Sequence, residues 1–186
     1  MTVPARLSHV LFSTRRYDAM IEWYCAVFEA RAVYRDPALA FIAFDEESHR
    51  FAIANLDVMR PGGDGGHGDI GLNHVAFTYS GASGLLETYA RLKAIGIEPY
   101  WPIHHGMTLS LYYLDPDGNR IELQADALSP EAAAAYFGGP AFAANPIGVA
   151  YDPDARLAEY RAGADEMMLL RVPDGPPSPI PAAHGP

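Results

Sequence analysis

The sequence has little cysteine, little positive charge and no long apolar run, and each shortage excludes a class of protein. Its single cysteine among 186 residues excludes an internal disulfide and favours a reducing compartment, so we expect a cytoplasmic protein. The 13 Lys and Arg stand against 23 Asp and Glu, and the net charge of −10 disfavours nucleic acid and anionic membranes as partners. No stretch is long and apolar enough to span a membrane, and residues 1–10 lack a secretory pattern.

Two segments of the chain resemble each other closely, LSHVLFST at 7–14 and LNHVAFTY at 72–79. Each has Leu, a polar residue, His, Val, an apolar residue and Phe, so His9 and His74 occupy equivalent places 65 residues apart. A single His in an apolar strand is usually a core residue. Two at equivalent positions of a repeat indicate a shared role, and we treat both as candidate metal ligands.

Each copy opens a unit with the same predicted order of elements, namely strand, helix and three strands. In the first module, residues 5–57, the expected helix cap is Asp18 and the strands are predicted at 7–13, 30–35, 39–45 and 49–56. In the second, 72–125, the predicted helix at 83–95 ends at Gly96, with strands at 72–80, 97–103, 108–115 and 119–125. Two such βαβββ modules, joined by a glycine-rich linker, predict an α+β fold: an open curved barrel whose central opening strands aim both His into one cavity.

The segment YYLDPDGNRIEL at 112–123 predicts a strand, a tight turn at 115–118 and a second strand. In the second strand Ile121 and Leu123 face one way and Glu122 the other. An alternating strand usually shows its polar face to water, so Glu122 taken alone would be an exposed residue. Together with two His, however, it completes two imidazoles and one carboxylate, a set that holds Fe(II) or a similar divalent ion and leaves coordination positions open.

These motifs resemble those of the vicinal oxygen chelate superfamily, which includes glyoxalase I, bleomycin-resistance proteins and type I extradiol ring-cleaving dioxygenases. LNHVAF and LYYLDPDGNRIEL carry the resemblance in the second module, and the repeat extends it to residues 5–125. It is closest to the single-domain extradiol dioxygenases of aromatic catabolism. It implies an enzyme that cleaves a catechol-type diol, such as catechol or 2,3-dihydroxybiphenyl, with O2. It also implies that His9, His74 and Glu122 hold Fe(II), with Mn(II) as the alternative ion.

The resemblance further implies catalytic residues near the metal. A Tyr ten residues before the Glu ligand is here Tyr112, and a His about eighteen residues before it matches both His104 and His105, of which we favour His105. A Tyr hydroxyl can hold a deprotonated substrate oxygen, and a His can move protons at neutral pH. Many family members carry a further His about fifteen residues before the second His ligand. Three alternatives are open for that role here. It is taken by His67 in the linker, it is taken by the pair His104 and His105, or the chemistry differs from catechol cleavage.

Two other functions are compatible with the resemblance, a glyoxalase-type isomerase or lyase and a non-enzymatic bleomycin-resistance-type binding protein. Glyoxalase I has a fourth ligand on the last strand of its first module, where this chain reads FAIANL and offers only Asn55. The binding proteins lack the metal triad. Both departures favour the dioxygenase.

Residues 126–186 lie outside the repeat. We expect a helix at 129–137 capped by Ser129, extended chain at 139–154, a helix at 155–164 and a loose Pro-rich end. We expect this C-terminal extension to wrap over the cavity mouth or over a partner subunit. The resemblance implies a homo-oligomer, a dimer or larger.

Overall fold

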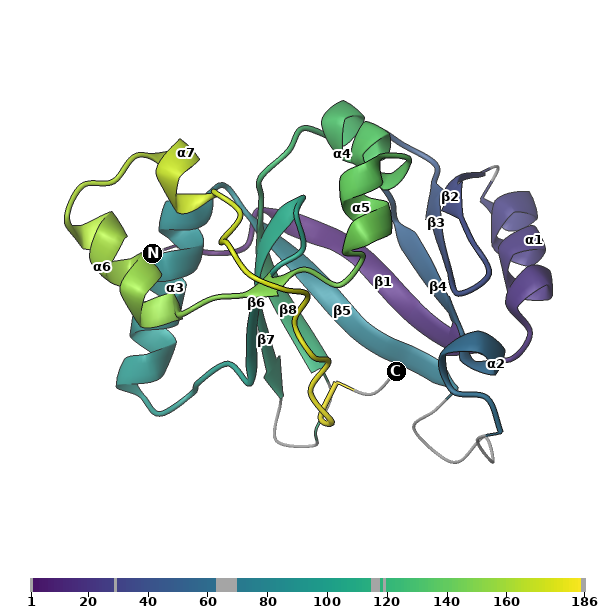
Figure 1. The fold of residues 1–186 in the computed structure, drawn as a ribbon, viewed down its shortest axis with the longest axis horizontal. Helices are drawn as coiled ribbons and strands as arrows, with labels where there is room; N and C mark the ends of the chain where they lie inside the picture. Colours follow the sequence, from purple (N-terminus) through teal and green to yellow (C-terminus); the bar gives the residue numbers. More distant parts are fainter. Residues whose placement is uncertain (1, 29, 63–69, 115–117, 119, 185–186) are drawn as a thin grey trace.

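The computed structural model describes residues 2–184 except 29, 63–69, 115–117 and 119. His67 and most of the predicted turn at 115–118 therefore lie outside the described residues. The described chain forms one curved, nine-stranded sheet in the order β2-β3-β4-β1-β5-β8-β7-β6-β9, with helices on both sides (Figure 1). No helix among the described residues is long and apolar enough to cross a membrane.

The two modules have the predicted order of elements. The first consists of β1 (Arg6–Thr14), α1 (Tyr17–Val27), β2 (Arg31–Arg35), β3 (Leu39–Ala43) and β4 (Phe51–Asn55), followed by the short helix α2 (Leu56–Met59). The second consists of β5 (Gly71–Tyr79), α3 (Ala82–Ala94), β6 (Trp101–His104), β7 (Thr108–Leu114) and β8 (Arg120–Asp126).

The equivalent opening strands β1 and β5 lie next to each other at the centre and run antiparallel. Each is flanked on its other side by the last strand of its own module, β4 beside β1 and β8 beside β5, and both of these pairs are parallel. The sheet curves without closing, which confirms the prediction of paired modules forming an open barrel.

Alternation along the strands separates an outer core from an inner face. Ala40 and Ile42 of β3 pack with Ile53 of β4 against α1. Their neighbours Phe41 and Ala52 belong to a second cluster on the other face. Because successive side chains of a strand point to opposite faces, the same short strands supply both a helix-covered core and the wall of a cavity.

Two local predictions differ from the structure, and a third agrees with it. Helix α1 begins before Asp18: its cap is Arg16, whose N–H donates to Thr14 Oγ1 (2.9 Å), and Asp18 lies in the first turn, 2.6 Å from Arg35. An acidic residue there is stabilising beside the helix N-terminus. Strand β6 begins at Trp101, later than predicted, although the Tyr100 N–H already donates to the Tyr112 carbonyl of β7 at 2.9 Å. Gly96 follows α3 with φ +79°, as its predicted capping place requires.

The C-terminal extension is folded onto both modules. It contains α4 (Pro130–Phe137), α5 (Pro140–Ala144), β9 (Val149–Ala150), α6 (Pro153–Arg161) and α7 (Glu166–Leu169). The predicted cap holds, since Ser129 Oγ accepts from the Ala132 N–H at 3.3 Å. The prediction of extended chain at 139–154 is wrong where α5 forms. This helix starts with Pro140 at a favourable first position and buries Phe142. In Figure 1, α6 and α7 lie against α3, whereas α4 and α5 cover the first module.

Candidate metal and substrate site

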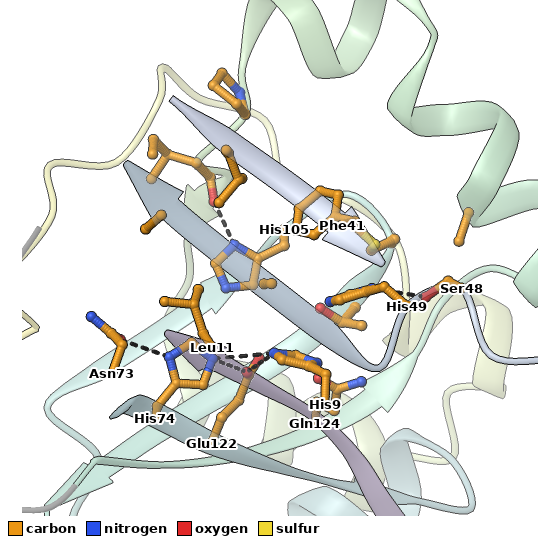
Figure 2. Close-up of a pocket in the computed structure, with 18 of the residues that line it drawn as sticks. His9, Leu11, Phe41, Ser48, His49, Asn73, His74, His105, Glu122 and Gln124 are labelled. Atoms are coloured by element: carbon orange, nitrogen blue, oxygen red, sulfur yellow. Dashed lines mark hydrogen bonds and ion pairs between the residues drawn. The ribbon is translucent and has the colours of Figure 1, made fainter. Parts of the chain in front are cut away.

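Three side chains from the central strands converge on one point of the inner face: His9 of β1, His74 of β5 and Glu122 of β8 (Figure 2). The two Nε2 atoms are 3.2 Å apart, and Glu122 Oε2 lies 3.4 Å from that of His9 and 3.2 Å from that of His74. All three side chains are buried, and Glu122 is only 1% exposed. The structure therefore brings together the three residues predicted as metal ligands.

Strand pairing explains why these residues meet. Glu122 pairs with Ala76, two residues after His74, so the side chains of Glu122 and His74 leave the sheet on the same face. On the other side of β5, Leu11 of β1 pairs with His74. The register of β1 shifts between Leu7 and Val10, on either side of His9. Such irregularities redirect side chains, and they are common next to functional sites.

The charges of the cluster suit a cation. Burial lowers the pKa of His9 to about 4, so this imidazole is neutral at neutral pH. Burial alone would raise the pKa of Glu122, but His74 and His9 outweigh it and hold that pKa well below its usual range. Glu122 Oε2 is also buried without a well-formed hydrogen bond. An ionised carboxylate whose buried oxygen faces two imidazole nitrogens forms with them a fitting donor set for a divalent ion.

Polar partners behind the cluster orient the rings. His74 Nδ1 donates to Asn73 Oδ1 at 2.8 Å, and a ring that carries its proton on Nδ1 presents the Nε2 lone pair to the cluster. Ser8 Oγ lies 3.4 Å from His9 Nδ1 and accepts a bond from Gln124 Nε2 at 3.1 Å. Metal-binding His residues usually carry such a partner on the second nitrogen, because it fixes the ring and its tautomer.

The cluster lies in the wall of a cavity of about 170 Å³. Much of the remaining wall is apolar and comes from both modules and the extension, including Leu11, Phe41, Trp101, Met107, Phe142 and Ile147. A mainly apolar cavity with a few polar groups at one place is typical of a site for a small organic molecule.

Tyr112 and His105, both predicted as catalytic, reach this cavity as a hydrogen-bonded pair. His105 Nδ1 donates to the Ile147 carbonyl at 2.5 Å, so its Nε2 accepts from the Tyr112 hydroxyl at 3.1 Å. Burial raises the pKa of Tyr112 well above its usual value, and Glu122 nearby raises it further. Burial lowers the pKa of His105. The pair is therefore a neutral phenol that donates to a neutral imidazole.

His104, the other predicted candidate, does not line the cavity. It is fully buried, with Nε2 donating to the Leu170 carbonyl at 2.8 Å and Nδ1 accepting from the Gly106 N–H at 3.0 Å. His104 is the last residue of β6 and His105 follows it directly, so the two side chains point in opposite directions and only His105 lines the cavity. Both nitrogens of His104 have backbone partners, so the structure gives it a packing role and corrects its expected catalytic one.

Sequence reasoning missed His49. It lines the cavity beside the cluster, with its ring centroid 4.5 Å from that of His9 and 4.6 Å from that of Phe41. The next residue, Arg50, ties this turn to β1 by donating to the Leu7 and Ser8 carbonyls at 2.8 and 2.9 Å. Burial holds the pKa of His49 well below its usual value. A prediction that the fourth strand pairs in parallel with the first would have indicated this contact.

His184 was missed as well. It comes from the Pro-rich end of the chain, which has no periodic pattern to predict its place, and it lines the same cavity.

Asn55, the residue considered as a possible fourth metal ligand, has other partners: its side chain accepts from the Asp57 N–H at 3.1 Å and donates to the Pro37 carbonyl at 2.8 Å. On the inner face β4 presents only Ala52 and Ala54.

Paired βαβββ modules with two His and a Glu converging between them are typical of metal-dependent enzymes. A family model described as the Glyoxalase/Bleomycin resistance protein/Dioxygenase superfamily matches residues 6–123. The chain is 46% identical over 158 residues to biphenyl-2,3-diol 1,2-dioxygenase 2 of Rhodococcus globerulus, covering 82% of this chain and 80% of that protein. It is 40% identical over 173 residues to biphenyl-2,3-diol 1,2-dioxygenase 3 of the same species, covering 91% and 89%.

Among solved structures, a catechol 2,3-dioxygenase matches with a TM-score of 0.56 and 19% identity over 68% of this chain. The chain spans 40% of the length of that structure, and the likeness is one of fold. From the family model and the two relatives, the chain belongs to the glyoxalase/bleomycin resistance/dioxygenase superfamily, which confirms the resemblance seen in its motifs.

Proposed function

We propose that this chain is an extradiol ring-cleaving dioxygenase that opens a catechol-type ring with O2, and that biphenyl-2,3-diol is one of its substrates. The observation that carries the proposal is the buried cluster of His9, His74 and Glu122 in the wall of a largely apolar cavity. The 46% identity to a biphenyl-2,3-diol dioxygenase supports both the reaction and the substrate.

The same three residues are the proposed ligands of Fe(II), with Mn(II) as the alternative ion. Two imidazole nitrogens and one carboxylate oxygen suit either ion and occupy only part of its coordination sphere. The bound ion would supply the path by which electrons pass from the diol oxygens to O2. Glu122, ionised at neutral pH, contributes the one negative charge of the ligand set.

Protons must leave the diol, and Tyr112 with His105 provides a route for one of them. The Tyr112 hydroxyl can accept a hydrogen bond from a substrate hydroxyl while it donates to His105 Nε2 at 3.1 Å. A proton taken from the diol can therefore pass through Tyr112 to His105. His49 is a second neutral imidazole on the same cavity, next to His9.

The apolar wall supports a bulky aromatic substrate. Phe41 and Phe142 line the cavity together with Leu11 and Met107, so a second, unsubstituted ring would be buried among aromatic and aliphatic side chains. Aromatic contacts of this kind are worth about 0.5–1.5 kcal/mol beyond the area they bury.

The test is anaerobic loading with Fe(II), followed by 2,3-dihydroxybiphenyl or catechol in air, with metal counted per chain. We expect a yellow ring-opened product that disappears in Glu122→Ala and His74→Ala. His104→Gln is the matched control, because this buried His has no contact with the cavity, and it should keep the colour. One tightly bound ion per chain without ring opening would contradict the dioxygenase, and no bound metal would contradict the ligand set.

Two further properties are proposed. The single cysteine favours a cytoplasmic location, and the resemblance alone favours a homo-oligomer. Light scattering that gives the mass of one chain, at micromolar concentration, would contradict the homo-oligomer. Secretion of the native protein into the medium would contradict the location.

A further inference from the structure

Residues 178–184, which we call the closing segment, are tied across the sheet at several points. The Ser178 N–H donates to the Gly148 carbonyl at 2.8 Å, and Trp101 Nε1 donates to Ser178 Oγ at 3.4 Å. At the other end Arg120 Nε donates to the Ala183 carbonyl at 2.8 Å. The closing segment is thus anchored on β6, on β8 and on the loop before β9, although it contains no helix or strand.

The anchored segment buries one polar ring. A turn closed by the His184 N–H and the Pro181 carbonyl, at 2.8 Å, directs the His184 side chain inward, where the residue is 9% exposed. Its Nδ1 lies 2.9 Å from the Tyr100 hydroxyl. Its ring centroid is 4.6 Å from that of Trp101 and 4.7 Å from that of Tyr112, both in edge-on geometry.

This ring lies at the end of the cavity that holds the candidate ligands. The centroid of His184 is 5.7 Å from that of His74, yet His184 is not one of the three residues whose ligand atoms converge. Ile180 of the same segment also lines the cavity. The closing segment therefore forms the wall where the ring that carries the two hydroxyls would lie, rather than the wall around a distant substituent.

We propose that His184 is a substrate-binding residue whose ring packs against the diol ring of the bound substrate, and that the closing segment forms this wall of the active site. The inference rests on the proposed function, because it places a diol at the three-residue cluster. An aromatic ring contact of this kind corresponds to about 3- to 10-fold in a dissociation constant. Because the contact is made with the diol ring itself, replacing His184 should weaken the binding of catechol and of 2,3-dihydroxybiphenyl equally.

Two variants separate the ring from its hydrogen bond. His184→Phe keeps an aromatic ring and loses the bond to Tyr100, whereas His184→Asn keeps a polar group and loses the ring. Val172→Ala is the matched control, since Val172 is 52% exposed in the same extension and does not line the cavity. Each full-length protein is loaded with Fe(II), and three quantities are measured: metal affinity, anaerobic binding of both diols by absorbance, and kcat and KM in air.

We expect His184→Asn to raise the dissociation constants of both diols about 3- to 10-fold with unchanged metal affinity. His184→Phe and Val172→Ala should stay within about twofold of the parent protein. If His184→Asn does not fold, Ile180→Ala tests the same wall and should weaken both diols about threefold.

Unchanged diol binding in His184→Asn, or in Ile180→Ala where His184→Asn does not fold, would overturn the inference. A loss of metal affinity in both His184 variants would also overturn it, because it would make this residue a ligand instead of a wall. Parent protein that binds both diols and never opens the ring would contradict the proposed function alone, since the binding constants would still decide the role of His184.

Discussion

Asn73 offers the sharpest test of how the candidate ligands are held. Its Oδ1 accepts from His74 Nδ1 at 2.8 Å, and the residue is 7% exposed. In Asn73→Ala the His74 ring loses the partner that fixes its tautomer and orientation. The Nε2 lone pair then no longer points to the cluster in a single arrangement, so we expect weaker metal binding with all three candidate ligands still present.

The size of the effect follows from the role of such partners. Removing one typically lowers metal affinity about 10- to 100-fold, which corresponds to roughly 1.4–2.8 kcal/mol. Loss of the buried hydrogen bond should also lower the free energy of unfolding of the metal-free protein by about 1 kcal/mol. Asn73→Asp, which still presents an oxygen acceptor to Nδ1, should retain most of the metal affinity.

The assay is titration of the metal-free protein with Mn(II), or with Fe(II) under anaerobic conditions against a competing chelator. Asn55→Ala is the matched control, because this Asn caps α2 from outside the cavity. It should lower stability by about 1 kcal/mol and leave metal affinity unchanged. Metal binding in Asn73→Ala as tight as in the parent protein would refute the reasoning, and a loss in Asn55→Ala would restore the four-ligand alternative.

Three further outcomes are expected. Glu122→Gln removes the negative charge of the cluster and should abolish binding of one ion per chain, so a full complement of metal after gel filtration would contradict the ligand set. Tyr112→Phe should keep the metal and lower kcat about 100-fold by breaking the proton route, and an unchanged kcat would exclude that route. Burial lowers the pKa of His104 to about 4 from 6.5, so the unfolded chain binds this proton first as the pH falls. The stability that neutral His104 contributes is fully present above pH 6.5 and falls as the pH is lowered towards 4. The total loss in the free energy of unfolding is at most about 3 kcal/mol. In urea unfolding, His104→Gln should flatten this loss, and an identical pH profile would contradict the assignment.

The repeat made the central part of the site predictable. Equivalent strands in two modules that share a sheet meet at its centre, and this alone places His9 next to His74. Glu122 followed from its alternation with Ile121 and Leu123, but the exposure expected for it in isolation was wrong, since it is 1% exposed. Strand β8 packs against α3 on one face and faces the cavity on the other, so the polar side chain of Glu122 is covered instead of facing water.

The missed residues depend on contacts between distant segments. His49 reaches the cavity because β4 pairs in parallel with β1 and Arg50 binds the carbonyls of Leu7 and Ser8. No local pattern encodes that pairing. The choice between His104 and His105 depended on where β6 ends and which face each residue takes, and element boundaries are the least certain part of a sequence prediction.

The C-terminal extension is part of the site and not an appendage of it. The modules alone carry the three candidate ligands, whereas the proposed proton acceptor depends on the extension. The Ile147 carbonyl accepts from His105 Nδ1, and only this bond leaves Nε2 free to accept from Tyr112. Without it either nitrogen could carry the proton, and the route from Tyr112 would be open in one tautomer and closed in the other. The extension therefore defines the direction in which a proton can move, while the central strands define where a metal can bind.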